Sequence, residues 1–438
     1  MKYSQPKGTF DILPKHIKIE DQWKLSHKWQ FLETVIKDLC TDYGFSEIRT
    51  PIFEMTDLFI RSAGDTSDIV AKEMYTFEDK GQRSLTLRPE GTAPAIRAFI
   101  ENHLMQFGQN HKFYYTGPFF RYDRPQAGRY RQLHQFGVEV IGRADPFVDA
   151  EMIDMLCELY RRLGLTNLEV LINSVGDEET RKNYQEAFLS FLKPFFSELS
   201  EDSQLRFSKN PLRILDTKDP KEKQILENAP SILNYLSPSS KAHFDQVCSC
   251  LTNLGISYKI DPKLVRGLDY YNKTVFEITS TGLGAQNTIG AGGRYDGLIK
   301  KLGGPDLPSF GFGTGLERIL LTMESQGCKF PEAPSCYYFI IGLGEKTHPL
   351  AFDTACKLRH KNISCQLYVK TAKIQKALEE AAESGCEQAL IIGEQELQSG
   401  ICQLKNLKNR QSIDIPLQNL IYELTQIWHQ NNQSINRY

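Results

Sequence analysis

The sequence predicts an α+β fold: an antiparallel sheet with helices on one side, followed by a separate C-terminal α/β domain. The N-terminal half runs helix, strands, helix, strands, and its strands are joined by hairpins instead of βαβ crossovers. Beyond residue 336, strand-like and helix-like segments alternate, as in an α/β layer. The length of 438 residues exceeds what one core can hold and indicates two or three domains.

Composition excludes several classes of protein. The chain is 24% charged and 40% hydrophobic with a net charge of −2, so any nucleic-acid partner must be bound by local basic patches. Its longest apolar stretches, such as residues 337–343, are too short to span a membrane, and no apolar signal or Arg-rich transit pattern begins the chain. Scattered cysteines without a Cys-x-x-Cys pair fit a reducing, cytoplasmic location. His243, Cys248 and Cys250 lack the second pair that a zinc site needs.

The first elements lead to a carboxylate at a junction. Apolar residues recur at helical spacing from Leu25 to Tyr43, and a strand broken by Pro51 follows, which places that strand at an edge or an interface. A hairpin then ends at Glu90, before a helix predicted over Ala93–Leu104 with Thr92 as its N-cap. Two roles are open for the carboxylate: binding an amino group, or favouring the helix N-terminus electrostatically.

A second hairpin carries an alternating pattern. Its strands, Phe113–Arg121 and Gln132–Ile141, flank a hinge with Pro125, Gly128 and the arginines Arg121, Arg124, Arg129 and Arg131. In the second strand His134, Phe136, Val138 and Val140 share one face, whereas Gln135, Gly137 and Glu139 share the other. The second set suits the floor of a site for a small polar ligand, with Arg121 for a phosphate. An exposed hairpin with solvated charges is the alternative.

Arg266 stands between apolar neighbours just before a strand predicted from about Tyr271. A buried guanidinium needs an anion, which either Asp269 or a ligand phosphate supplies. Tyr270 and Tyr271 add ring faces and hydroxyls for polar recognition.

Two glycine-rich segments follow. Residues 290–296 suggest a flexible basic loop around Arg294. Gly311, Gly313 and Gly315 then clear one face of a strand for a planar ligand, and Arg318 falls in the first turn of the next helix. The spacing matches neither a dinucleotide fingerprint nor a P-loop, which leaves open a nucleotide lying on the glycine face.

Together these segments resemble class II aminoacyl-tRNA synthetases, and specifically the histidyl-tRNA synthetase family, over nearly the whole chain. Three segments resemble the class motifs, of which the first forms a dimer interface: Gly44–Phe53, Phe120–Glu139 and Gly311–Arg318. Three more resemble the histidine-specific signatures and the loop that accompanies them: Leu264–Tyr271, Gly292–Asp296 and Leu87–Thr92.

The resemblance implies ATP-dependent ligation of L-histidine to tRNA(His) through a histidyl-adenylate, with Mg²⁺, by a cytoplasmic homodimer. The implied histidine-binding residues are Glu90, Gly91, Thr92, Arg121, Gln135, Glu139, Arg266, Tyr270 and Tyr271. The implied ATP-binding residues are Arg121, Asp123 and Arg318, and the catalytic arginines are Arg266 and Arg121. Two positions depart from the family: Asp123 replaces the usual Glu, and Leu133 replaces a stacking Phe.

The implied domains are a catalytic domain over residues 1–330, with an insertion at about 178–255, an anticodon-binding domain over 336–430 and a polar tail over 431–438. Two alternatives are weighed: a regulatory subunit of ATP phosphoribosyltransferase that senses histidine, and a pseudo-synthetase module of a kinase regulator. Paralogues of the first kind lose signature residues, whereas Glu90, Arg121, Arg266 and Arg318 are all present here. The second requires a kinase domain, and the sequence shows none.

Overall fold

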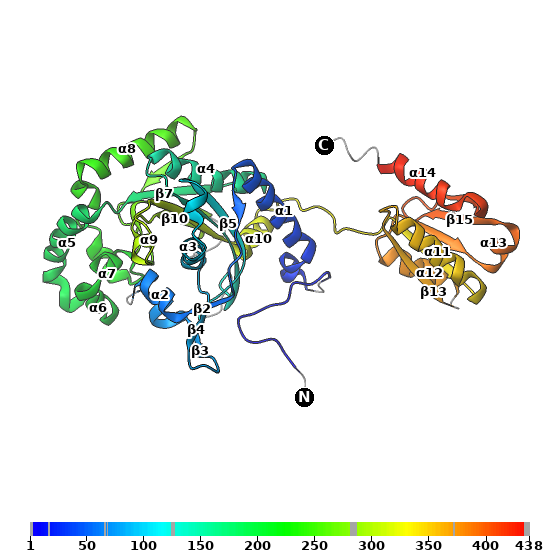
Figure 1. The fold of residues 1–438 in the computed structure, drawn as a ribbon, viewed down its shortest axis with the longest axis horizontal. Helices are drawn as coiled ribbons and strands as arrows, with labels where there is room; N and C mark the ends of the chain where they lie inside the picture. Colours follow the sequence, from blue (N-terminus) through cyan, green and yellow to red (C-terminus); the bar gives the residue numbers. More distant parts are fainter. Residues whose placement is uncertain are drawn as a thin grey trace. The chain divides into compact units, whose positions relative to one another are not determined.

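The computed structural model describes residues 3–15, 18–64, 67, 69–123, 128–280, 287–370 and 373–432. Arg124 and Pro125 of the predicted hinge and residues 433–438 of the predicted tail lie outside this part of the chain. The chain separates into two compact units, Met1–Pro331 and Glu332–Tyr438 (Figure 1). Within the described residues, no helix is long and apolar enough to cross a membrane.

An eight-stranded sheet forms the centre of the first unit. Its order is β1-β5-β6-β11-β10-β9-β7-β8, and the pairs are antiparallel except β1 with β5 and β7 with β8. Its strands are β1 (Ser46–Glu47), β5 (His111–Phe120), β6 (Gln132–Ile141), β7 (Leu168–Ser174), β8 (Tyr258–Ile260), β9 (Asn272–Ser280), β10 (Thr288–Arg294) and β11 (Ser309–Gly315).

A layer of long helices covers one face of this sheet. The layer consists of α1 (Ser26–Asp42), α4 (Pro146–Arg162), α8 (Pro238–Asn253) and α10 (Leu316–Ser325). Phe136, Val138 and Val140 of β6 are buried in the core beneath it, as the alternation predicts. On the other face, Ile141 packs with α3 (Thr92–Glu101) and α9 (Leu298–Lys301), so helices are not confined to one side.

A small sheet of order β2-β4-β3 lies beside the main one. It is built from β2 (Phe53–Met55), β3 (Tyr75–Glu78) and β4 (Ser84–Leu87), with α2 (Thr56–Ala63) next in the chain after β2. The predicted break at Pro51 is confirmed, since β1 ends at Glu47 and β2 begins at Phe53. Proline has no N–H for a ladder, which explains why two strands replace one.

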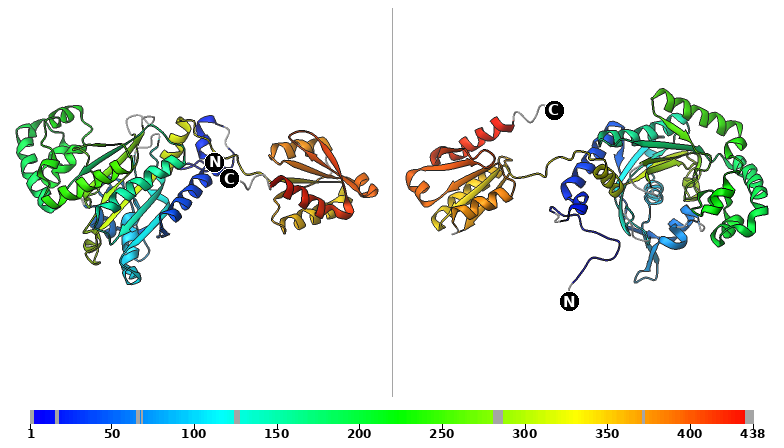
Figure 2. Two further views of the ribbon diagram at one scale, coloured as in Figure 1. Left: turned by 90° about the horizontal axis from the view of Figure 1, so that it is seen from above. Right: turned by 180° about the vertical axis from the view of Figure 1, so that it is seen from behind.

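Of the helices between β7 and β8, α8 lies in the layer over the sheet, and the others gather at one end of the first unit (Figures 1 and 2). The four are α5 (Glu178–Leu192), α6 (Glu201–Lys209), α7 (Pro220–Leu226) and α8. Their N-termini are capped by side chains, as where Asp177 accepts from the Thr180 N–H and Ser200 from the Ser203 N–H.

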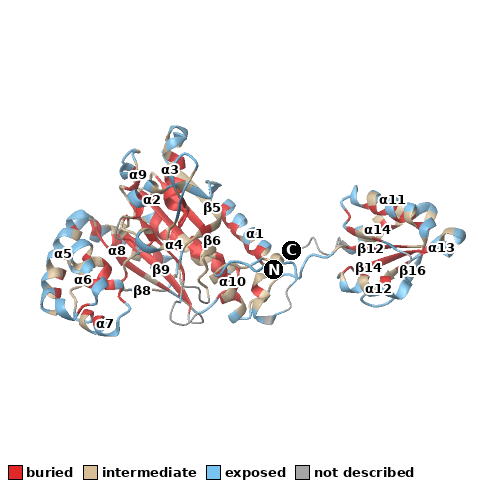
Figure 3. Ribbon diagram, turned by 90° about the horizontal axis from the view of Figure 1, so that it is seen from below, coloured by how far each residue is buried: buried red, intermediate tan, exposed pale blue. Residues whose placement is uncertain are grey.

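The second unit is a five-stranded sheet of order β13-β12-β14-β15-β16. Its strands are β12 (Tyr338–Leu343), β13 (Cys365–Lys370), β14 (Gln388–Ile392), β15 (Ile401–Asn406) and β16 (Ser412–Pro416). Its helices are α11 (His348–Arg359), α12 (Ile374–Glu383), α13 (Glu394–Ser399) and α14 (Leu420–Asn432). Figure 3 shows buried β12 and β14 between α11 and α14 on one face and α12 on the other, the predicted α/β layer.

Two local predictions are wrong. The helix predicted over Ala93–Leu104 spans Thr92–Glu101, and Gly91, not Thr92, is its N-cap residue. The predicted flexible loop around Arg294 is strand β10, which pairs with β9 and β11. The strand is possible because Arg294 is fully buried and ion-paired with buried Asp149, a partner on α4 that is distant in sequence.

Candidate active site

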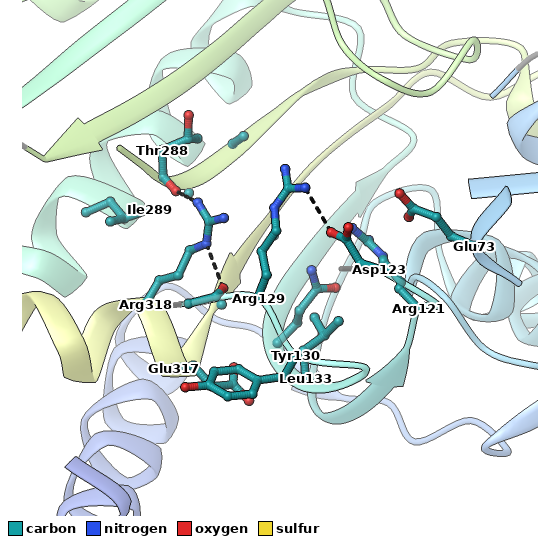
Figure 4. Close-up of a pocket in the computed structure, with 16 residues that line it drawn as sticks. Glu73, Arg121, Asp123, Arg129, Tyr130, Leu133, Thr288, Ile289, Glu317 and Arg318 are labelled. Atoms are coloured by element: carbon teal, nitrogen blue, oxygen red, sulfur yellow. Dashed lines mark hydrogen bonds and ion pairs between the residues drawn. The ribbon is translucent and has the colours of Figure 1, made fainter. Parts of the chain in front are cut away.

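A polar cavity of about 220 Å³ opens beside β6, β10 and β11 of the central sheet. Gln135, Gly313 and Gly315 contribute to its lining, with Arg121 towards one end and Arg318 towards the other (Figure 4). An added Cβ on Gly313 would meet no atom within 4 Å, so this glycine keeps the sheet face open. The residues predicted for ATP therefore meet around one cavity.

Three guanidinium groups surround this cavity. Arg121 Nε donates to the Pro89 carbonyl at 2.8 Å, and Arg318 Nε donates to the Gly128 carbonyl at 3.2 Å. Arg129 pairs with Asp123 at 2.9 Å. Burial, and then the charges of Arg129 and Arg121, lower the pKa of Arg318. Cations that repel one another in a cavity favour an anionic ligand.

Glu317 holds the start of α10 on the sheet. Its carboxylate accepts the His134 backbone N–H at 2.8 Å and lies 2.9 Å from His134 Nδ1. Arg318 directly follows Glu317, so this contact between α10 and β6 also fixes the position of the Arg318 backbone. Sequence reasoning missed Glu317, although its position beside Arg318 in a glycine-flanked helix start is a usable signal.

A second group of predicted residues lies buried around the start of α3. Glu90 is 5% exposed and accepts the backbone N–H groups of Thr92 at 2.7 Å and Ala93 at 2.9 Å. The carboxylate therefore does stabilise the helix N-terminus, one of the two roles left open. Burial raises its pKa, although these N–H groups and the charge of Arg121 act in the opposite direction.

Glu139 is 1% exposed and is held by two tyrosines. Tyr115 donates to Oε1 at 3.0 Å and Tyr295 donates to Oε2. Burial raises the pKa of Glu139 to about 8. Gly311 makes room for this carboxylate, since a Cβ there would lie 2.2 Å from Oε2. The prediction that Gly311 clears space for a planar ligand is therefore wrong.

Tyr115 is the main residue that sequence reasoning missed on this side. It is paired directly with Gly137 across β5 and β6, and a Cβ on Gly137 would lie 2.4 Å from its ring. Gly91 leaves room for the same ring at 2.2 Å. The Tyr115 ring therefore fills the gap predicted at Gly137. An aromatic residue opposite a glycine on the neighbouring strand is the sequence feature that could have revealed it.

Asp269, one of the two anions considered for Arg266, is not its ion-pair partner in the structure. Arg266 forms an ion pair with Glu277 of β9, whereas Asp269 accepts from Asn210 at 2.8 Å. Arg266 and Tyr271 line a second cavity of about 60 Å³, so Arg266 is not brought into the lining of the larger one. Its charge still acts on the buried tyrosines, because it is among the causes that shift the pKa of Tyr271.

The rings of Tyr270 and Tyr271 are tilted by 45° with 4.7 Å between their centroids, and Tyr270 also contacts Tyr295 edge-on. Burial strongly raises the pKa of Tyr270, so its hydroxyl stays a hydrogen-bond donor. Leu133 lines the larger cavity, where it offers an apolar surface in place of an aromatic ring. An antiparallel sheet with a glycine-opened anion site next to buried carboxylates and tyrosines defines an aminoacyl-tRNA synthetase of class II.

Comparison with known proteins agrees with this class. Residues 24–319 match the family model of histidyl-tRNA synthetase, and residues 338–427 match that of an anticodon-binding domain. Histidine–tRNA ligase of Protochlamydia amoebophila is 50% identical over 96% of this chain and 99% of its own length, and that of Bacillus subtilis is 45% identical over 96% and 98%. The solved apo histidyl-tRNA synthetase of S. aureus matches with a TM-score of 0.80 and 39% identity, covering 96% of this chain and 99% of that one. The chain belongs to the histidyl-tRNA synthetase family.

Proposed function

We propose that this chain ligates L-histidine to tRNA(His) with ATP, through a histidyl-adenylate, releasing AMP and pyrophosphate. The observation that carries the proposal is the open cavity in which Arg121, Arg129 and Arg318 repel one another beside buried Glu139 and its tyrosines. The three arginines suit a polyanionic ligand, and Glu139 with its tyrosines suits a small polar ring. Family membership and coverage by relatives named as ligases support the same activity.

The proposed roles follow the two halves of this site. ATP is held by Arg121 at its α-phosphate and by Arg318 at the adenine and γ-phosphate end, with Asp123 towards the adenine. Histidine is held at its amino group by Glu90 and Thr92 in the loop that Gly91 shapes, at its carboxylate or ring by Gln135, and at its imidazole by Glu139, Tyr270 and Tyr271. Arg266 is the catalytic arginine specific to histidine activation.

The chemistry is in-line displacement without a covalent enzyme intermediate. A histidine carboxylate oxygen attacks the α-phosphorus, the bond to the bridging oxygen breaks, and pyrophosphate leaves. Arg121 and Arg266 stabilise the charge that develops on the phosphoryl oxygens, so catalysis consists of positioning and electrostatics. A hydroxyl of the terminal adenosine of the tRNA then attacks the carbonyl carbon of the adenylate, and AMP departs.

Mg²⁺ fits this cavity as an ion held mainly by substrate. Among the described residues, no group of three or more His, Cys, Asp or Glu side chains is placed to hold a metal ion. Mg²⁺ typically takes one or two carboxylates plus substrate phosphates, and Glu73 and Asp123 both line the cavity. The ion would neutralise charge on the departing pyrophosphate.

The chain is proposed to work as a cytoplasmic homodimer. Ile52, Phe53, Met55 and Phe77, on or beside the small sheet, are 44–51% exposed, an apolar surface that a second copy would cover. All ten cysteines are free, which suits a reducing compartment. We further propose that residues 336–430 bind the anticodon and that 178–255 form an insertion domain within the catalytic domain, 1–330.

Histidine-dependent exchange of labelled pyrophosphate into ATP tests the activity. The full-length protein should exchange label with histidine and not with other amino acids, and it should charge tRNA(His). Circular dichroism establishes that the sample is folded. A folded protein that binds histidine without exchanging label would support the regulatory alternative instead.

A further inference from the structure

Glu277 lies on an interior strand and is fixed through both carboxylate oxygens. Its strand, β9, is paired with β10 on one side and β7 on the other. Oε2 accepts from the Thr288 hydroxyl at 2.8 Å, and Oε1 forms the ion pair with Arg266. The side chains of Glu277 and Arg266 are only 19% and 22% exposed, so solvent screens this pair weakly.

Arg266 itself has little backbone support. It lies before β9 in a segment of turns and bends, and its buried Nε has no hydrogen-bond partner among the described residues. A long, rotatable side chain on such a segment needs an external contact to adopt one orientation. Glu277 provides that contact from a strand that is paired on both sides.

Thr288 connects this pair with the second arginine. Its hydroxyl donates to Glu277, while its carbonyl accepts from Nη1–H of Arg318 (Figure 4). Thr288 also lines the larger cavity. A single pair of residues on β9 and β10 therefore contacts both Arg266 and Arg318.

We propose that Glu277 and Thr288 are positioning residues that hold Arg266 and Arg318 in the orientations needed for the phosphates of ATP. Glu277 orients Arg266 through its carboxylate, and Thr288 fixes that carboxylate and anchors Arg318. A guanidinium has five N–H donors, so Arg266 can keep its bond to Glu277 while other N–H groups bind phosphate. This inference rests on the proposed function and adds two residues to its machinery.

Single-turnover formation of histidyl-adenylate at saturating ATP and histidine tests the inference. Glu277→Gln keeps the shape and removes the charge, so it should slow the step roughly tenfold to a hundredfold while the histidine KM changes much less. Arg266→Ala and the double variant Glu277→Gln/Arg266→Ala complete a cycle. Because Glu277 acts through Arg266, the double variant should be no slower than Arg266→Ala alone, within about twofold.

Thr288→Val should slow the same step by about threefold to tenfold, and Thr288→Ser should restore it, since only the hydroxyl reaches Glu277. Asp216→Asn is the matched control. Its carboxylate senses the charges of both Arg266 and Glu277 but belongs to the helical region between β7 and β8, and its rate should match wild type. Thermal unfolding of each variant establishes that differences in rate do not come from loss of fold.

Each other outcome has a defined meaning. A Glu277→Gln rate within twofold of wild type, or effects that multiply in the double variant, would overturn the positioning role. A faster Glu277→Gln would show that Glu277 restrains Arg266. A higher Mg²⁺ requirement in Glu277→Gln would assign the carboxylate to the metal instead. Absence of exchange in wild type would refute the proposed function itself, separately from this inference.

Discussion

The two halves of the site differ in the partners of their charged side chains. At the half proposed for phosphate, Arg121 and Arg318 donate to main-chain carbonyls, which carry no net charge. At the half proposed for the imidazole ring, Glu139 is bonded to two tyrosines, and Arg294, the neighbour of Tyr295, is ion-paired with buried Asp149. Changes in the first half should therefore alter rate with little loss of stability, whereas changes in the second should also destabilise the fold.

Arg294→Ala gives the largest expected effect. Removing the guanidinium leaves fully buried Asp149 with its contact to His243 Nε2 at 2.7 Å but without its arginine partner, and such a loss costs about 3–5 kcal/mol of unfolding free energy. Chemical denaturation measures the change. Arg129→Ala is the control, because its pair with Asp123 is partly exposed and worth about 1 kcal/mol or less. Equal losses for both variants would contradict the difference between the halves.

Arg266→Ala should raise the barrier to adenylate formation by about 3–4 kcal/mol, as for loss of a preorganised donor, and weaken histidine binding less. Its ion pair keeps 22% and 19% side-chain exposure, whereas the pair of Arg294 and Asp149 keeps none, so the unfolding midpoint should shift less than for Arg294→Ala. Single-turnover kinetics measures the change in the barrier, and a thermal melt measures the change in the unfolding midpoint. An unchanged rate at saturating histidine would remove Arg266 from the chemistry.

A truncated chain ending near Glu332 should retain both halves of the site and still exchange pyrophosphate. The first compact unit ends at Pro331, and every residue assigned to histidine or ATP precedes it. Charging should suffer through a tRNA KM raised about tenfold to a hundredfold, because remote binding energy positions the acceptor end. Size measurement must show the same oligomeric state as the full-length protein, and circular dichroism must show an intact fold. A folded truncated protein with an unchanged tRNA KM would refute the proposal that the second unit helps to bind tRNA.

Above pH 8, where Glu139 is ionised, Glu139→Gln should raise the histidine KM about tenfold and the ATP KM little, since a charged acceptor holds a ring N–H more tightly than an amide does. Steady-state kinetics with each substrate varied in turn distinguishes the two effects. If both constants change equally, Glu139 supports the sheet and does not read the ring.

The pH dependence of stability gives the most specific effect. The pKa of Glu139 rises on folding from 4.5 to about 8. Its protonated form is therefore favoured by folding, and the associated stability is complete below about pH 4.5 and lost as pH rises through 8. Relative to Glu139→Gln, the wild type should lose stability between these values. If the difference in melting temperature between wild type and Glu139→Gln stayed constant from pH 5 to 8, the raised pKa of Glu139 would be contradicted.

The sequence alone determined the features that depend on local pattern. Alternation along residues 132–141 predicted which face of β6 enters the core, and Pro51 predicted the broken strand. The family resemblance assigned Arg121, Asp123, Gln135 and Arg318 to one site. These four residues do line one cavity. Such patterns are readable because strand period, proline geometry and short spacings act between neighbours in the chain.

Tertiary structure decided which polar groups satisfy one another. Arg294 became structural because folding places Asp149 against it, and Arg266 is paired with Glu277, eleven residues away across a strand start, rather than with nearby Asp269. Tyr115 fills the gap at Gly137 only because the two residues pair across β5 and β6. Burial makes an unpaired charge costly, so partners are chosen by position in space, and spacing along the chain does not reveal them.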